Sequence, residues 1–481
     1  MKSVENEDSC WTTCPECLGR GKKSRRISKK ERFRYQLAVE EFEKTNKHGV
    51  APVRPKGNLF PCEKCKGSGL IAALSHPIPD HEKFPHVAII GGGIGGVALA
   101  VACLHRGIPF SLFERDKSFD VRSQGYGLTL QQASKAIQSF GLFSLKNGLV
   151  SKRHVVHTTD GNVIGEWGIR KWLQTDENPF SKRTNVHIAR QSLRLELLEQ
   201  LGKHNSIYWG HQLIDVKEVA ERGLELSFQV DGQIKHAKAD LVVGADGIRS
   251  SVRRFLMDED APLRYLDCMV ILGICPLAAL HDFKHPLLDS ETVFQTANGD
   301  ARIYIMPFDA TSVMWQLSFP ISEKEASELS AMGVKALKEE ACRRTQWHEP
   351  IPQILAATHE KAISGYPVYD REMLKPEQLA NAASATLIGD AAHPMSPFKG
   401  QGANQAILDA LALARAIYQE SSNWKEKGIR AAVLTAFEIE MIKRSASKVK
   451  DSAAAAQFLH TDIVLHKADA PRGRGMLTKE G

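Results

Sequence analysis

The sequence predicts an α/β fold, in which a parallel-sheet domain is interleaved with an antiparallel-sheet domain, followed by a C-terminal helix and preceded by a small cysteine-rich module. Three observations predict it. Hydrophobic segments associated with glycine–acid turns recur at residues 87–114, 241–247 and 385–390. Residues 266–364 alternate polar and apolar side chains, as antiparallel strands do. Two C-x-x-C pairs lie within the first 65 residues.

Length and composition bound the class of protein. A chain of 481 residues is too long for one simple core, so we expect two or three domains. The apolar run 87–104 approaches the length of a membrane span, but its five glycines and the following His105-Arg106 favour a strand, a turn and a buried helix. The chain opens on a polar segment without an apolar signal region, so we expect a cytoplasmic protein with no membrane span.

The formal net charge of +7 belongs mostly to the N-terminal part. Residues 1–84 carry 17 Lys/Arg and 11 Asp/Glu, or +6, which leaves 46 against 45, or +1, for the rest. A solvated helical face is the simpler interpretation of the basic run 22–34, and contact with nucleic acid or an anionic membrane is the alternative. Because only Phe33 and Tyr35 accompany these charges, we expect no stable nucleic-acid binding, although the basic arm leaves it possible.

Two motifs of the form C-x-x-C-x-G-x-G predict a metal site. Each cysteine pair can give two thiolates to one Zn²⁺, and together they make a tetrahedral set of Cys14, Cys17, Cys62 and Cys65. Redox-active dithiols or disulfides are the alternative, which an intracellular setting disfavours. Cys10 lies outside the repeat and is expected to be free. The repeat resembles the zinc-binding repeat of DnaJ-type co-chaperones, which carry four motifs where this chain has two.

The insert between the two cysteine motifs, residues 28–49, has helical composition, with Phe33, Leu37 and Phe42 on an apolar edge. Residues 1–84 are therefore predicted to form a zinc-binding module with a helical arm. Since four thiolates leave no open coordination position, we expect this zinc not to be catalytic.

Residues 87–114 have the strand–turn–helix–strand order of a Rossmann-like dinucleotide-binding unit. Gly91-x-Gly93-x-x-Gly96 opens an apolar helix, and the next strand ends on Glu114, 23 residues after the first glycine. Gly91 permits the turn, Gly93 lets the backbone approach a pyrophosphate, and Gly96 allows close helix packing. Glu114 can accept from ribose hydroxyls and favours an unphosphorylated ribose, so FAD or NAD fits and NADP does not.

Two further glycine–acid turns follow buried strands. Asp246-Gly247 comes after residues 241–243, and Gly389-Asp390 after the strand that starts at residue 385. Each turn alone is common in loops. Together with the first turn they suggest a long ligand across the carboxyl edge of the sheet, longer than NAD alone.

With these motifs in this order, the chain resembles a class A flavoprotein monooxygenase of the aromatic hydroxylase type over about residues 86–450. The segment "GDAAHPMSPFKGQGAN" is similar to salicylate-hydroxylase-like and tetracycline-inactivating members, which does not fix a substrate. Arg190 stands where the family has a flavin-contacting arginine. The resemblance implies that FAD is bound by Gly91, Gly93, Gly96, Glu114, Arg115, Arg190, Asp246, Gly247, Gly389, Asp390, Pro397, Gly400, Gln401, Gly402, Ala403 and Asn404.

The resemblance also implies a reaction. NAD(P)H, as a transient co-substrate, reduces FAD, and O₂ then gives a C4a-hydroperoxide whose distal oxygen is transferred to an aromatic or polycyclic small molecule. Asp390 is expected to accept from the ribityl chain, and the loop 397–402 to direct backbone N–H groups and a helix end at the isoalloxazine. No side chain is marked as a general base, and His393 beside Pro394 is interpreted as structural.

The domain boundaries follow from the change in pattern. Hairpin turns are predicted at Asp160-Gly161, Asn298-Gly299 and residues 309–311. Six residues either roof an apolar pocket over the flavin or belong to the core: Phe294, Tyr304, Met306, Phe308, Trp315 and Phe319. The expected parts are a FAD-binding domain (85–150, 188–265 and 365–420), a substrate domain (151–187 and 266–364), a C-terminal helical region (421–465) with a helix over 430–459, and a disordered tail (466–481).

Two other functions stay open. A flavin-dependent halogenase shares the fold, but the W-x-W-x-I-P motif is absent and no lysine follows the glycine turn. A flavin-based redox sensor or interaction protein acting through the zinc arm is the second alternative.

Overall fold

The computed structural model describes residues 10–25, 27–45, 51–52, 57–121, 125–174, 185–202, 206–219, 223–257, 262–281, 283–382 and 384–472. The chain divides into two compact units. The first comprises Met1–Ile78 and His105–Gly107, and the second comprises Pro79–Leu104 and Ile108–Gly481. In the described part of the chain, no helix combines the length and the apolar character that crossing a membrane requires.

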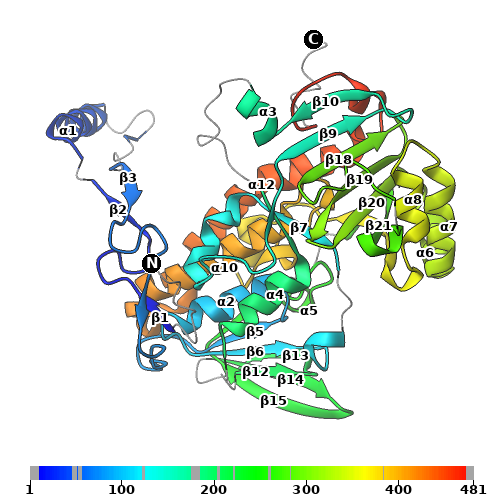
Figure 1. Ribbon diagram of the computed structural model, residues 1–481. Coiled ribbons are helices and arrows are strands. Elements are labelled where there is room, and N and C mark those ends of the chain that lie inside the picture. The colour runs from blue at the N-terminus through cyan, green and yellow to red at the C-terminus, as the bar shows by residue number, and fades with distance from the viewer. Residues whose placement is uncertain are drawn as a thin grey trace. The chain divides into compact units, whose positions relative to one another are not determined.

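The described part of the first unit contains two short antiparallel ribbons and one helix (Figure 1). Strand β1 (Cys10–Thr13) pairs with β4 (Leu70–Ala73), and β2 (Lys22–Ser24) pairs with β3 (Leu59–Pro61). Helix α1 (Lys29–Lys44) lies between β2 and β3 in the sequence.

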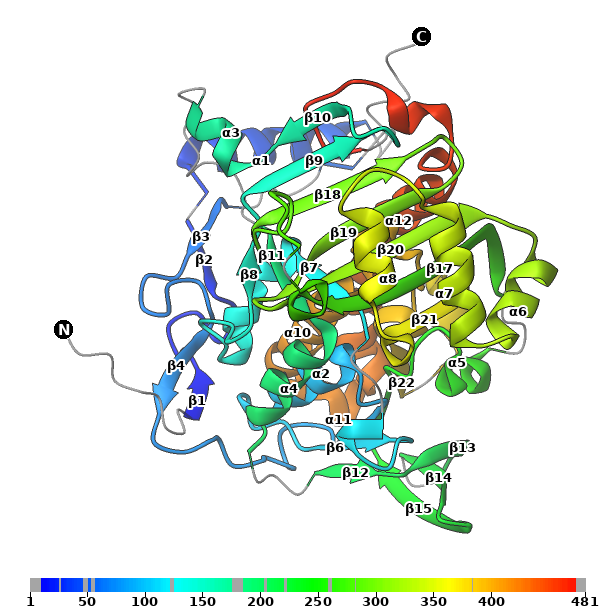
Figure 2. The ribbon, with the colours of Figure 1, turned by 45° about the vertical axis from the view of Figure 1, so that its right-hand side comes forward.

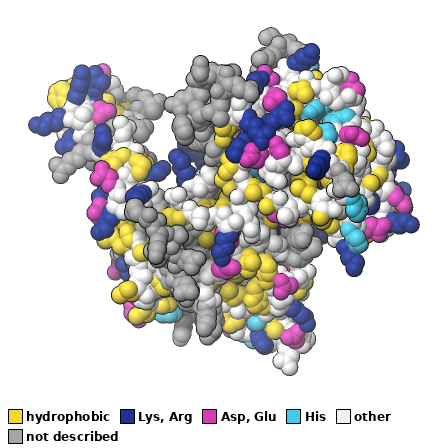
Figure 3. Space-filling model, viewed as in Figure 1, with side chains coloured by type: hydrophobic (Ala, Val, Ile, Leu, Met, Phe, Trp, Pro, Cys, Tyr) yellow, Lys and Arg dark blue, Asp and Glu magenta, His cyan; other side chains and the backbone are white. Residues whose placement is uncertain are grey.

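Helix α1 begins at a capping box, in which the side chains of Ser28 and Glu31 each bond the backbone N–H of the other. None of its described side chains is buried. Phe33 is 61% and Leu37 47% exposed, so these two residues of the predicted apolar edge face solvent, whereas Phe42 is half-buried. Figure 3 shows Lys and Arg side chains spread over this helix, with hydrophobic ones among them.

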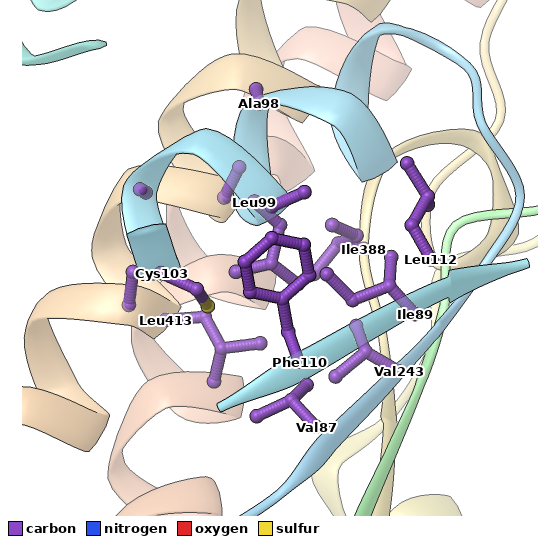
Figure 4. Close-up of a cluster of buried hydrophobic side chains, with 14 of the residues drawn as sticks. Val87, Ile89, Ala98, Leu99, Cys103, Phe110, Leu112, Val243, Ile388 and Leu413 are labelled. Atoms are coloured by element: carbon purple, nitrogen blue, oxygen red, sulfur yellow. The ribbon is translucent and has the colours of Figure 1, made fainter. Parts of the chain in front are cut away.

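The second unit is built on a parallel sheet of order β12-β6-β5-β16-β22. All four pairings are parallel, and three of the strands are buried along their whole length, which explains their uninterrupted apolar sequences. Side chains of the sheet pack against Leu99 and Cys103 of α2 (Ile94–Leu104) and Leu413 of α10 (Gly402–Glu420) (Figure 4). The strands are β5 (Val87–Ile90), β6 (Phe110–Glu114), β12 (Ile207–Trp209), β16 (Leu241–Gly244) and β22 (Ala385–Leu387).

A seven-stranded sheet of order β10-β9-β18-β19-β20-β17-β21 forms the other half of this unit. Helices α6 (Glu323–Ala331), α7 (Val334–Arg344) and α8 (Ile351–Ala357) cover one face (Figures 1 and 2). The predicted hairpins at Asp160-Gly161 and Asn298-Gly299 are confirmed. The strands are β9 (Arg153–His157), β10 (Val163–Trp167), β17 (Arg264–Pro276), β18 (Thr292–Ala297), β19 (Arg302–Asp309), β20 (Ser312–Pro320) and β21 (Ile363–Asp370).

Two smaller sheets and several short helices complete the unit. One antiparallel sheet has the order β7-β11-β8 and the other β13-β14-β15. The predicted α/β class is confirmed. The remaining elements are β7 (Gly127–Leu130), β8 (Leu149–Val150), β11 (Val186–Ala189), β13 (Gln212–Glu218), β14 (Leu224–Val230), β15 (Gln233–Ala239), α3 (Ile169–Gln174), α4 (Arg190–Glu199), α5 (Ser251–Leu256), α9 (Pro376–Leu379) and α11 (Trp424–Lys427).

The C-terminal region differs from the expectation in two respects. The helix predicted over 430–459 begins with a π-helical turn, and α12 proper is Thr435–Phe458. The tail was expected to be disordered from residue 466, but residues 466–472 are ordered, and Arg472 is buried because hydrogen bonds fix this segment to β10. The rest of that tail, 473–481, lies outside the described residues.

Candidate functional site

The glycine loop after β5 needs its first and third glycines for the fold itself. Gly91 has φ +108, and a Cβ there would lie 2.5 Å from the carbonyl oxygen of Ala245. A Cβ on Gly96 would lie 1.8 Å from the carbonyl oxygen of Gly91. A Cβ on Gly93 would meet no atom of the protein within 4 Å. Gly93 therefore borders open space, as a position where the backbone approaches a ligand must.

Glu114, at the end of β6, is bonded to this loop. One carboxylate oxygen accepts from the N–H of Gly92 at 2.7 Å and the other from the N–H of Asp116 at 3.0 Å. The carbonyl oxygen of Gly92 accepts from Nε of Arg194 at 2.6 Å. Arg194 was not predicted, but it follows Arg190 by four residues and so shares one face of α4.

The two other glycine–acid turns end neighbouring strands at the same sheet edge. The carboxylate of Asp246 accepts from the hydroxyl of Ser250 at 2.5 Å and from the N–H of Ser251 at 2.6 Å, at the start of α5. Burial raises the pKa of Asp246. Gly247 is in the left-handed region with φ +84. The exposed side chain of Arg115, by contrast, points to solvent.

Asp390 and Arg190 form the charged part of the site. Burial raises the pKa of the Asp390 carboxyl, against the effect of the Arg190 charge. The pKa of Arg190 is raised in spite of burial. The larger cause is the phenol of Tyr126, and the smaller one is the charge of Asp390. The guanidinium of Arg190 lies 5.3 Å from the centre of the Tyr126 ring. These two predicted residues, contributed by different parts of the chain, thus interact electrostatically.

His393, interpreted from the sequence as structural, is buried and pairs with an acid of α10. Its Nε2 lies 2.7 Å from Oδ2 of Asp409, which also accepts from the N–H of Gly389 at 2.8 Å. Oδ1 of Asp409 accepts from Arg444 at 2.9 Å. Although burial opposes the charged form, Asp409 raises the pKa of His393. The buried pair therefore holds the Gly389-Asp390 turn in place.

The loop from Pro397 to the start of α10 is fixed by amide side chains. Oδ1 of Asn404 accepts from the backbone N–H groups of Gln131 and Ala133, at 2.9 and 3.1 Å. Nδ2 of Asn404 donates to the carbonyl oxygens of Thr129 and Gly400. The predicted residue Asn404 thus bonds protein backbone, and it sets the loop against β7.

A cavity of about 940 Å³ separates this loop from the seven-stranded sheet. Its volume is within the range of small-molecule sites. The loop contributes Asp390 and residues 394–403, among them Pro397, Gly400, Gln401, Gly402 and Ala403, and the sheet contributes residues of β18–β21. Oε1 of Gln401 is buried without a hydrogen-bond partner among the described residues.

Two of the six predicted roof residues line this cavity, Tyr304 and Met306. Alternation along the strands directs Phe294, Trp315 and Phe319 to the opposite face, where they pack in the core beneath α6–α8. Trp315 there donates to the hydroxyl of Thr358 at 2.9 Å. Phe308 packs against Met306 and Met314, apart from that core.

Polar groups in the cavity wall were missed by sequence reasoning. Nδ1 of His187 lies 2.9 Å from the hydroxyl oxygen of Thr129, and its Nε2 has no partner among the described residues. Burial lowers the pKa of His187 to about 3 and that of His154 to about 4, so both are neutral at pH 7. Only its position three residues before Arg190 could have drawn attention to His187.

The four predicted metal ligands converge in the first unit. The sulfur atoms of Cys14, Cys17, Cys62 and Cys65 all lie within 4.8 Å of one another, and all four side chains are buried. The last glycine of each motif donates its N–H to the second cysteine: Gly21 to Sγ of Cys17 at 3.2 Å and Gly69 to Sγ of Cys65 at 3.3 Å. Such bonds favour thiolates, so the site fits a tetrahedral metal ion.

The comparisons with known proteins decide the cofactor. A family model described as FAD binding domain matches residues 85–430. The chain belongs to this family. Among curated relatives, an aurachin C monooxygenase/isomerase of Stigmatella aurantiaca is 29% identical over 341 residues, 70% of this chain and 81% of the relative. A 3-amino-4-hydroxybenzoate 2-monooxygenase of Streptomyces cremeus is 26% identical over 345 residues, 68% and 77%.

The fold is also found in solved structures. That of Klebsiella pneumoniae HpxO with FAD and uric acid has a TM-score of 0.63 and 20% identity, and the match covers 79% of this chain and 88% of that one. The family match and the named curated relatives together show that this chain is a flavoprotein monooxygenase. Its glycine loop, with open space at Gly93, fits a bound dinucleotide.

Proposed function

We propose that this flavoprotein uses NAD(P)H and O₂ to hydroxylate an aromatic or polycyclic small molecule in the 940 Å³ cavity. The observation that carries the proposal is the position of this cavity. One wall is the segment from Asp390 to Ala403, and the opposite wall is the sheet with Tyr304 and Met306. A planar substrate between them would lie against the predicted flavin loop.

The FAD would be held at the carboxyl edge of the parallel sheet. We infer that Gly93 and the start of α2 approach its pyrophosphate, and that Glu114 accepts from ribose through the lone pairs not used by the N–H of Gly92. Arg190, Asp246, Asp390 and the loop to Asn404 would surround the rest. When bound, FAD supplies the electrons from NAD(P)H and the activation of O₂.

The chain's own contribution is orientation and exclusion of water. The apolar side chains of Met306 and Met314 in the cavity wall would help to exclude water from the reacting region, which would limit the loss of activated oxygen as H₂O₂. The neutral imidazole of His187 can exchange a hydrogen bond with a substrate hydroxyl or amine through Nε2. The substrates named for the relatives, 3-amino-4-hydroxybenzoate and, as a bound molecule, uric acid, support a ring-containing substrate.

The test mixes FAD-loaded protein with NADH or NADPH and a panel of phenols, aromatic acids and polycyclic compounds, and follows absorbance at 340 nm together with H₂O₂. We expect one class to accelerate NAD(P)H oxidation with little peroxide. Colourless, folded protein that ignores added FAD would contradict the proposal.

We also infer that Cys14, Cys17, Cys62 and Cys65 bind Zn²⁺ as a structural ion. Loss of the metal should unfold the first unit, because metal binding supplies roughly 10–16 kcal/mol of apparent stability to small zinc modules. We expect Cys62→Ser to lower the zinc content of purified protein to near zero, and Cys10→Ser, outside the cluster, to leave it unchanged. Equal zinc in both variants would contradict the assignment.

A further inference from the structure

The C-terminal segment 466–472 contributes a wall of the substrate cavity. The N–H of Ala468 donates to the carbonyl oxygen of Ile164 in β10 at 3.0 Å. The carboxylate of Asp469 accepts from the N–H of Glu166 at 2.9 Å and from Nζ of Lys171 at 2.6 Å. Gly165 leaves room for this segment, since a Cβ there would lie 2.2 Å from the carbonyl oxygen of Ala468.

The segment is also bonded to the loop that forms the opposite wall. Nζ of Lys399, between Pro397 and Gly400, donates to the carbonyl oxygen of Arg472 at 2.7 Å. Both Pro471 and Arg472 line the cavity. The segment therefore connects the edge of the seven-stranded sheet to the predicted flavin loop, and it brings one side chain, that of Arg472, into the lining.

Arg472 is buried, and it forms no ion pair among the described residues. The residue is 6% exposed, and its Nη1 donates to the carbonyl oxygen of Ala468 at 2.9 Å. Its Nε and Nη2 have no hydrogen-bond partner among the described residues. No carboxylate of the described chain lies within ion-pair distance of it. Burial lowers the pKa of Arg472, and the charge of Asp469, which is itself bonded to Lys171, only partly offsets this effect. A buried charge in this state requires a partner of opposite charge.

A second arginine in the same wall is also without a carboxylate partner. Nε of Arg302 donates to the amide oxygen of Gln295 at 2.7 Å, and its guanidinium lies 5.2 Å from the centre of the Tyr304 ring. No ion pair of Arg302 occurs within the described ranges. Positive charge predominates in the whole lining, where five cationic side chains (Arg249, Arg302, Lys399, Lys448 and Arg472) meet two carboxylates (Asp390 and Asp451).

We propose that Arg472, with Arg302, binds the carboxylate of an aromatic acid substrate, so that the C-terminal segment determines specificity for anions. The proposal rests on the proposed function and names its substrate class. A guanidinium offers two parallel N–H groups that match a carboxylate, and Nε with Nη2 of Arg472 form such a pair. Tyr304 and the aromatic ring of Trp167, which also line the cavity, suit the ring of the same substrate.

The test measures binding to the FAD-loaded protein through the change in flavin absorbance. The ligands are matched pairs that differ in charge: salicylate and salicylamide, 4-hydroxybenzoate and 4-hydroxybenzamide, anthranilate and anthranilamide. We expect the wild type to prefer at least one acid over its amide about 10-fold or more. In Arg472→Gln the Kd of that acid should rise roughly 10- to 100-fold, the loss typical of a hydrogen bond to a charged group, while the Kd of the amide stays within about 3-fold.

Two further variants separate charge recognition from folding. Arg472→Lys keeps the charge without the paired N–H groups, and we expect it to weaken acid binding less than Arg472→Gln does. Arg343→Gln removes an exposed arginine of α7 outside the cavity lining, and we expect wild-type binding. Flavin content and the thermal midpoint of each variant check its folding.

Several outcomes would overturn the proposal: no preference for acids in the wild type, equal weakening of acid and amide in Arg472→Gln, or an effect of Arg343→Gln as large as that of Arg472→Gln. These outcomes are distinguishable from failure of the proposed function. Protein that binds FAD and couples NAD(P)H oxidation to hydroxylation of a neutral aromatic compound would keep the proposed function and refute only the role of Arg472. Protein that binds no FAD would refute both.

Discussion

Replacing Gly93 by alanine should separate ligand binding from folding in the glycine loop. The φ of Gly93 is not in the left-handed region, and the added Cβ meets no protein atom within 4 Å. The free energy of unfolding of the FAD-free protein should therefore be unchanged or rise by about 0.4–1 kcal/mol. The same methyl group would occupy the approach of a pyrophosphate. Losing one charge-assisted backbone hydrogen bond costs about 1.5–3 kcal/mol, so the Kd for FAD should rise roughly 10- to 150-fold.

The matched control is Gly96→Ala, three residues further along the chain, in the first turn of α2. Its Cβ would lie 1.8 Å from the carbonyl oxygen of Gly91, so the backbone must shift, and we expect a loss of roughly 1–3 kcal/mol or more in the FAD-free protein. Chemical denaturation of the protein stripped of flavin measures the free energies, and quenching of flavin fluorescence measures the Kd. Wild-type FAD affinity in Gly93→Ala, or equal destabilisation by both substitutions, would refute the role given to Gly93.

Two further predictions concern buried histidines and acids. Burial lowers the pKa of His154 and His157 to about 4 and that of His187 to about 3, so below about pH 6.5 the unfolded chain takes up protons that the folded chain does not. The free energy of unfolding should therefore fall with decreasing pH by up to about 4 kcal/mol per pH unit near pH 5. His187→Gln should reduce that slope by about a third, as measured by urea titrations at several pH values. An unchanged slope would contradict the prediction. Asp409→Asn leaves buried cations without their partner and should lower the free energy of unfolding by roughly 3–5 kcal/mol. Glu440→Gln, which removes an exposed partner of Arg444, should lower it by about 1 kcal/mol or less. Similar losses for both variants in thermal or urea unfolding would contradict this difference.

Elements with one strong local signal were predictable from the sequence. The strand Val87–Ile90, at the start of the predicted strand–turn–helix unit, was predictable because an apolar run between a polar segment and a glycine loop has one plausible end. The turns at Asp160-Gly161 and Asn298-Gly299 were predictable because a tight hairpin turn needs a residue that tolerates positive φ. The glycines indeed have φ of +87 and +90. The cysteine pairs converge because the motif itself encodes the turn that directs both sulfur atoms inward.

The cavity wall was less predictable, since its residues come from distant segments. Tyr304 and Trp315 are both aromatic residues in alternating strands, and only the assembled sheet decides which of them faces the cavity. Arg472 was assigned to a disordered tail because the composition of that segment is polar. The burial of Arg472 depends on hydrogen bonds between the segment and β10. Asn404 and Asp246 carry family motifs, but which of their polar atoms bond backbone depends on neighbours that the motif does not contain.

The position of residues 468 and 469 against β10 has a consequence for solubility. Strand β10 is the last strand on its side of the seven-stranded sheet, and an uncovered last strand offers its N–H and carbonyl groups to other chains. The carbonyl oxygen of Ile164 and the N–H of Glu166 are instead bonded to Ala468 and to the Asp469 side chain. Protein shortened to residue 465 would present these groups to a second molecule, and we expect it to aggregate through the sheet edge more readily than the full chain.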